Sequence, residues 1–262
     1  MIALVLLFAC EGPVERGNRA LQEDDLLRAE REFRAALDGD PTDAEALSGL
    51  GWTFHQAGED GPARDAFLSL IASHPELPGG YRGVGNLLLS QGQLPGAREQ
   101  LKKAVELAPE DPAANQSMAL LELAEGKPAD ALARVEALLG ADVDQGELQQ
   151  TRAVALIRLE RPAEARTAAQ LAVNSAAGPR ALAAARITWV QAVLTESDGR
   201  VDGDRCGETA GPVRAWLDAA DHVLDQVEAE GALRSTELDM RKQVRRRRAF
   251  IEDECPSGAG GN

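Results

Sequence analysis

The sequence of 262 residues is poor in aromatic side chains, which make up 3% of it. Strands are enriched in aromatic and β-branched residues, so an apolar set dominated by Ala and Leu favours closely packed helices. Positive charge is also scarce, because 28 Lys and Arg stand against 43 Asp and Glu, a net charge of −15. Nucleic-acid phosphates need cations to displace their counterions, and anionic lipid surfaces attract basic proteins. The charge balance therefore argues against nucleic-acid binding and against a general attraction to lipid headgroups.

Residues that carry metal or nucleophilic chemistry are few and scattered. The three histidines are His55, His74 and His222, and no two of them stand at metal-ligand spacing on one helix. Gly83 and Gly85 begin a dinucleotide-binding pattern, but its third glycine is missing. We therefore expect no cofactor, no metal, no small-molecule substrate and no catalytic residue. An enzyme or enzyme accessory is therefore the least favoured functional hypothesis.

The apolar N-terminus is short, with nine apolar residues before Cys10, whereas a helix needs about 20 to span a bilayer. This length fits the apolar region of an export signal. Leu7, Ala9 and Cys10 resemble a bacterial lipobox, although Phe8 stands where a small residue is usual and no Lys or Arg precedes the run. The resemblance implies a signal peptide at residues 1–9, lipidation of Cys10 and a periplasmic location. The outer membrane is favoured, because Glu11 after Cys10 does not resemble the Asp that retains lipoproteins at the inner membrane in some bacteria. The alternative is an incidental apolar N-terminus on a cytoplasmic protein.

Only two cysteines remain if Cys10 is lipidated, namely Cys206 and Cys255. A periplasmic pair is expected to oxidise, and a bond between them would close a loop worth about 4 kcal/mol in the chain-entropy model. We therefore predict a Cys206–Cys255 disulfide. The alternative is two unrelated thiols in an intracellular protein.

Internal periodicity is the strongest signal in the chain. Five series of residues share a spacing of 34: Ala29, Ala63, Ala97, Ala131 and Ala165; Pro41, Pro75 and Pro109; Gly17, Gly51 and Gly85, followed by Ala119 and Ala153; Phe33, Phe67, Leu101 and Val135; Gly58, Gly92 and Gly126. Small residues let the two helices of a hairpin approach, and the large apolar residue fills the groove between hairpins. Glycine permits the left-handed end of the first helix, and proline ends the second. One hairpin cannot bury its own apolar face, but a stack can.

The pattern resembles the tetratricopeptide repeat. The second and third units match it best, through Leu50, Gly51, Phe54, Ala63, Phe67 and Pro75, and through Tyr81, Val84, Gly85, Ala97, Leu101, Ala104 and Pro109. The resemblance implies an all-α fold, a right-handed α-solenoid of helical hairpins with a C-terminal capping helix. It also implies a non-catalytic scaffold for protein–protein interaction.

The predicted layout follows from the 34-residue register. Five repeats occupy residues 10–179, and a divergent sixth occupies 180–231. A polar inserted loop at 197–211 is expected in the sixth, since its Pro-x-x-Ala pattern is delayed to Pro212. A capping helix at 232–254 would cover the end of the stack, and a Gly-rich tail at 255–262 is expected to be disordered.

One strongly basic stretch runs from Arg241 to Arg248. It could contact an acidic partner or lipid phosphates. Alternatively, its cations complement the dipole of the capping helix and pair with the acidic body of the chain. The second interpretation is favoured.

First helices of tetratricopeptide repeats line the concave face of the solenoid, and by resemblance five positions of each point into it. The predicted partner-binding groove comprises Trp52, His55, Arg82, Asn86, Leu89, Leu120, Leu123, Val154, Ile157 and Arg158. Spacings of three and four place the members from each repeat on one helical face. An exposed apolar concavity often marks a binding surface, here for an extended or helical peptide. The alternative is that these residues pack against neighbouring first helices.

The sequence thus predicts a lipid-anchored scaffold that binds a protein segment in its groove and assists assembly of an envelope complex. A narrower hypothesis is a factor like the pilotin lipoproteins, which help type IV pilus secretins to assemble. A cytoplasmic adaptor without lipid is the alternative from another class.

Overall fold

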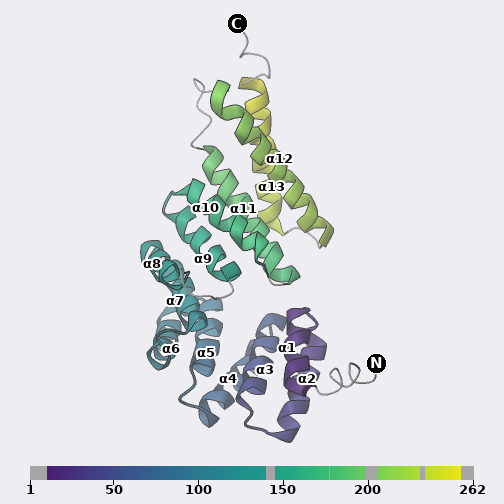
Figure 1. The fold of residues 1–262 in the computed structure, drawn as a ribbon, viewed down its shortest axis with the longest axis vertical. Coiled ribbons are helices and arrows are strands. Elements are labelled where there is room, and N and C mark those ends of the chain that lie inside the picture. Colours follow the sequence, from purple (N-terminus) through teal and green to yellow (C-terminus); the bar gives the residue numbers. More distant parts are fainter. Residues whose placement is uncertain (1–10, 140–144, 177, 199–205, 231–233, 255–262) are drawn as a thin grey trace, which may run out of the picture. The chain divides into compact units, whose positions relative to one another are not determined.

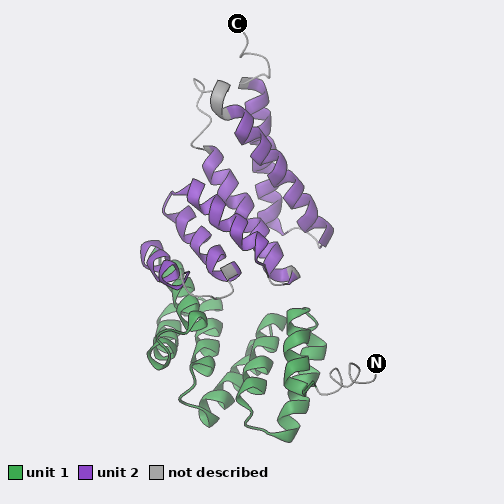
Figure 2. Ribbon diagram, in the orientation of Figure 1, with its two compact units in different colours: residues 1–127 green, residues 128–262 purple. Residues whose placement is uncertain are grey.

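A computed structural model describes residues 11–139, 145–176, 178–198, 206–230 and 234–254 (Figure 1). Within these ranges the chain forms thirteen α-helices and no strand. The chain divides into two compact units, residues 1–127 and 128–262 (Figure 2). The predicted lipidation site Cys10, Cys255 and the tail 255–262 lie outside the described residues, as does the side chain of Cys206. Lipidation and the disulfide therefore stay predictions.

The first unit is built from helices paired in chain order. They are α1 (Pro13–Gln22), α2 (Leu26–Gly39), α3 (Ala44–Ala57), α4 (Asp60–Ser73), α5 (Pro78–Ser90), α6 (Leu94–Leu107) and α7 (Pro112–Ala124). The first helices of successive pairs touch, α1 with α3, α3 with α5 and α5 with α7. In the described part of this unit, α2, α4 and α6 contact the first helices beside them but not one another. The row whose helices touch is the inner one, so it forms the concave side of this unit.

Two phenylalanines lock neighbouring hairpins together, as the 34-residue series predicts. Phe33 and Phe67 are fully buried. A Cβ placed on Gly49 would lie 2.3 Å from the Phe33 ring, and one on Gly83 would lie 2.3 Å from the Phe67 ring. Glycine is therefore required there, because each ring packs directly on the backbone of the next first helix.

The turns inside the hairpins follow the predicted register. Gly58, Gly92 and Gly126 have φ of 77°, 71° and 74°, the left-handed conformation expected of helix-ending glycines. Asp24 and Glu160 stand at the same register in the first and fifth repeats and also have positive φ, 61° and 57°. The backbone turn thus persists where the glycine is absent, because the packing of the hairpin dictates it.

The second unit contains α8 (Pro128–Leu138), α9 (Gln145–Arg158), α10 (Pro162–Asn174), α11 (Pro179–Asp198), α12 (Cys206–Glu230) and α13 (Ser235–Glu254). Here α9 contacts α11, and α11 contacts α13, so these three helices form the inner row of the unit. Among the described residues, no helix is both long and apolar enough to serve as a membrane span.

The sixth hairpin corrects one sequence prediction. Part of the predicted loop at 197–211 is helical, because α11 continues to Asp198 and α12 already begins at Cys206. Pro212 lies inside α12 rather than at its start. Proline removes one backbone donor and crowds the preceding turn, yet α12 extends for a further turn and more on its N-terminal side. The Pro-x-x-Ala pattern therefore did not mark the first residue of this helix.

Candidate functional site

Three of the predicted groove residues meet on the inner row of the first unit. The Trp52 and His55 rings on α3 lie edge to face with centroids 5.7 Å apart, and Trp52 contacts Phe67 in the same manner at 5.2 Å. The guanidinium carbon of Arg82, on α5, lies 4.6 Å from the Trp52 ring centroid. This cation–π geometry holds Arg82 over the indole. The buried Phe67 ring thus holds in place a cluster of Trp52, His55 and Arg82 on the inner row of helices.

Polar side chains join adjacent first helices beside this cluster. The Asn86 side-chain amide on α5 donates to Ser117 Oγ on α7 at 3.0 Å, and the Asn18 amide on α1 donates to Glu45 Oε1 on α3 at 2.7 Å. The sequence prediction missed Asn18, Glu45 and Ser117. Asn18 and Glu45 occupy the ninth and second positions of their repeats, so the groove register itself contained the signal for both.

Three polar atoms of this region are buried and have no hydrogen-bond partner among the described residues. They are Trp52 Nε1, His55 Nδ1 and Asn86 Oδ1. A buried donor or acceptor without a partner costs about 1–3 kcal/mol. All three belong to predicted groove residues on α3 and α5.

Burial lowers the pKa of His55 below its ordinary value of 6.5, and the charge of Asp60 only partly offsets this. The unfolded chain therefore binds a proton at His55 more readily than the folded chain does. Above pH 6.5, the ordinary pKa that His55 has in the unfolded chain, the ring is neutral in both states and the folded protein keeps its full stability. As the pH falls through 6.5 towards the lower pKa of the folded protein, the unfolded chain takes up the proton first and the folded protein loses stability.

We expect His55→Gln to reduce the loss of thermal stability between about pH 8 and about pH 5.5. The measurement is the melting temperature at each pH, taken as the difference between variant and wild type. His222→Gln is the matched control, because His222 is exposed on α12. An identical pH slope for wild type, variant and control would contradict the assignment.

The leucines of the predicted groove do not share one environment. Leu120 on α7 is 39% exposed, and Leu89 on α5 is partly buried against the core. Leu123 is only 4% exposed, so its placement in the groove was wrong. Three residues along a helix turn the side chain about 60° backward around the axis, which on α7 carries Leu123 from the surface into the core.

The remaining predicted groove residues lie on α9 in the second unit. Val154 and Ile157 are partly buried, and Arg158 is exposed. The structure describes the two units separately, so a groove that continues from Trp52 to Arg158 stays a prediction. The part supported by direct contacts is the inner face of α3, α5 and α7, here called the α3–α5–α7 face.

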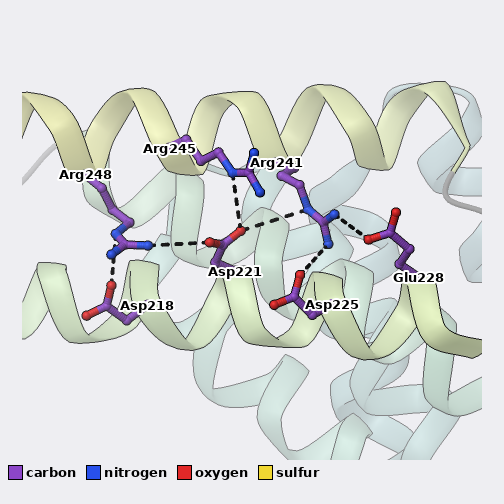
Figure 3. A network of polar contacts seen from close by, with 7 residues as sticks. All are labelled: Asp218, Asp221, Asp225, Glu228, Arg241, Arg245 and Arg248. Carbon is purple, nitrogen blue, oxygen red and sulfur yellow. Dashed lines mark hydrogen bonds and ion pairs between the residues drawn. The ribbon is translucent and has the colours of Figure 1, made fainter.

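Three arginines of the basic stretch on α13 pair with carboxylates of the neighbouring helix α12. Arg241, Arg245 and Arg248 all point towards carboxylates of α12 (Figure 3). This confirms the interpretation that cations of the stretch pair with the acidic body. No group of three metal-ligating side chains gathers in the portion of the chain that the structure describes.

Paired helices, an inner row of first helices and an aromatic–cationic face define a repeat scaffold for protein interaction. Tetratricopeptide-repeat family models match residues 14–78, 62–112 and 88–153. The chain belongs to the tetratricopeptide repeat family. The predicted all-α solenoid is thereby confirmed, and the fold indicates a protein–protein interaction scaffold.

Solved structures show the same fold at low sequence identity. A tetratricopeptide protein of Thermus thermophilus is 24% identical, with a TM-score of 0.61 over 70% of this chain and 97% of that one. PilF of Pseudomonas aeruginosa is 20% identical, with a TM-score of 0.56 over 88% and 96%. PilW, described as a type IV pilus biogenesis factor, is 14% identical, with a TM-score of 0.58 over 87% and 95%. No curated protein matches the chain.

Proposed function

We propose that this protein is a membrane-anchored scaffold whose α3–α5–α7 face binds a segment of a partner protein. The observation that carries the proposal is the convergence of Trp52, His55 and Arg82 on the inner row. Tryptophan and arginine are enriched among the residues that dominate binding energy at protein interfaces. Leu120 adds exposed apolar surface from α7, the helix that packs beside α5.

The anchoring part of the proposal rests on the lipobox-like residues Leu7, Ala9 and Cys10. A lipid on Cys10 would raise the effective concentration of the scaffold beside partners in the same membrane. The negative net charge of −15 fits this arrangement, since a lipid rather than a basic surface would hold the protein at the membrane. We place the protein in the cell envelope, on the periplasmic side and by preference at the outer membrane.

The specific process that we propose is assembly of a type IV pilus secretin. The support is architectural: PilF and PilW are structural neighbours that the chain covers almost completely. Because one fold hosts many functions, the process needs its own test. Deletion of the gene should lower the amount of secretin multimers, measured by immunoblot of unheated membranes. Normal multimers and pili in the deletion strain would exclude this process while leaving the scaffold proposal intact.

The binding face is tested with variants of the full-length protein and the partner recovered by photo-crosslinking from position 52. Trp52→Ala is expected to weaken binding about 30-fold, as loss of an interface hot spot does. Leu120→Lys should also weaken it, and this change spares the core because Leu120 is exposed. Leu68→Ala is the control, since Leu68 is exposed on the second-row helix α4. Unchanged affinity in both the Trp52→Ala and the Leu120→Lys variants, with unchanged melting temperatures, would refute the proposal that the α3–α5–α7 face binds the partner.

The anchor is tested separately by the intact mass of the protein extracted from native membranes. A chain that begins at Cys10 and carries acyl groups would support the lipoprotein, and a mass two hydrogen atoms below the reduced form would support the Cys206–Cys255 disulfide. Globomycin should then cause the precursor to accumulate. An unmodified chain beginning at Met1 in the soluble fraction would favour the cytoplasmic adaptor instead.

A further inference from the structure

The last helix, α13, is attached by few apolar side chains. Among its described residues, the buried apolar ones are Val244 and Ile251, whereas Leu238 and Phe250 are exposed. By contrast, the preceding inner-row helix α11 buries six apolar side chains: Ala185, Trp189, Val190, Ala192, Val193 and Leu194. Apolar burial therefore accounts for less of the attachment of α13 than of α11.

Ion pairs contribute to the contact between α13 and α12. Arg241 is only 11% exposed and meets three carboxylates: Glu228 at 2.6 Å, Asp225 at 2.9 Å and Asp221 at 3.9 Å (Figure 3). Such a low exposed fraction for an arginine signals a paired guanidinium, since unpaired ones are rarely buried. Arg241 is thus the central cation of the contact.

Two further arginines extend the contact along the helices. Arg248 lies 3.0 Å from Asp218 and 3.5 Å from Asp221, and Arg245 lies 3.9 Å from Asp221. Asp221 is therefore shared by all three arginines, as Figure 3 shows. Steps of three and four residues put each set on one face of its helix. We call Asp218, Asp221, Asp225 and Glu228 the acidic stripe of α12.

We propose that the acidic stripe of α12 is a docking surface for a basic helix, and that α13 occupies it as an exchangeable internal ligand. The partner that fits is a helix with Arg or Lys at steps of four and three residues, matching Arg241, Arg245 and Arg248. This choice of occupant follows from the complementary charges of α12 and α13. The inference uses no residue of the α3–α5–α7 face, so either proposal can fail alone.

Two physical consequences follow from a contact of this composition. Ion pairs at the surface weaken with salt, because the Debye length falls from about 10 Å at 0.1 M to about 3 Å at 1 M. This affects Arg245, which is 64% exposed, more than Arg241, which is 11% exposed. In addition, α13 is tethered to the stripe, so it competes with any free helix at a high effective concentration. A free basic helix should therefore bind the wild-type protein weakly and bind strongly once α13 is loosened.

The probe is a fluorescent peptide with the sequence of residues 234–254, titrated against the full-length protein at low salt. The variant Arg241→Gln/Arg245→Gln/Arg248→Gln loosens α13 and should bind the peptide at least about tenfold more tightly than wild type. Adding Asp221→Asn and Asp225→Asn should abolish that gain. The control Lys242→Gln/Arg246→Gln removes two cations of α13 that are not part of the network in Figure 3, and it should bind the peptide as weakly as wild type.

If a variant is partly unfolded, hydrogen exchange of the wild-type protein provides a test that needs no variant. In wild type, an excess of unlabelled peptide should speed amide exchange in residues 235–253 while α9 to α11 stay protected. The proposal is overturned if α13 keeps its protection at saturating peptide. It is equally overturned if the folded arginine variant binds no more tightly than wild type, or if the asparagine changes leave binding unaltered.

Discussion

Phe67→Ala is expected to destabilise the first unit by about 3–5 kcal/mol, the range for removing a fully buried phenylalanine. The Phe67 ring has no exposed surface and packs in the space that Gly51 and Gly83 leave between α3, α4 and α5. It also contacts the Trp52 ring, so the change would loosen the α3–α5–α7 face. The cavity cannot be filled by small side-chain shifts, because part of its wall is glycine backbone.

The measurement is urea unfolding followed by circular dichroism, with Trp fluorescence as a second probe. Leu68→Ala is the matched control, because the adjacent Leu68 is 47% exposed and should lose little on truncation. In a repeat protein each repeat is stabilised by its neighbours, so we expect the first unit of the Phe67 variant to unfold before the second. Equal effects of the two alanine changes would show that Phe67 does not tie the hairpins together.

Arg166→Ala is expected to destabilise the second unit by about 3–5 kcal/mol, the cost of removing one partner of a buried ion pair. The Nε atom of Arg166, on α10, lies 2.7 Å from Glu196 Oε2, on α11. Glu196 is only 2% exposed, so its carboxylate depends on partners within the protein. The guanidinium carbon of Arg166 also lies 4.4 Å from the Trp216 ring centroid on α12. One side chain thus joins three consecutive helices.

The control for this prediction is Arg161→Ala, at the start of the same helix. Arg161 pairs with Glu164 at 2.7 Å, but both side chains are largely solvent-exposed, so little change in stability is expected. Replacing the pair together, as Arg166→Met with Glu196→Leu, should recover much of the lost stability, since no buried charge is then left unpaired. Denaturant unfolding of all three variants measures these differences. A double variant no more stable than Arg166→Ala would contradict the explanation.

The sequence determined the repeating parts of the structure. The period of 34 residues, the Phe33 and Phe67 positions and the turn glycines recur in register, and each is a local or nearest-neighbour requirement. The same register brought Trp52, His55 and Arg82 together, because equivalent positions on adjacent first helices lie side by side. Such features can be recognised in a single sequence because every hairpin imposes the same packing on the next.

Tertiary structure alone decided the features that depend on one particular contact. The early start of α12 and the burial of Leu123 have no matching sequence signal. The Arg166–Glu196 pair joins residues 30 positions apart. Likewise, the choice of partner for each arginine of α13 depends on the rotation of two helices about their axes. A shift of about 60°, less than one residue of helical turn, decides whether a side chain meets a carboxylate, the core or solvent.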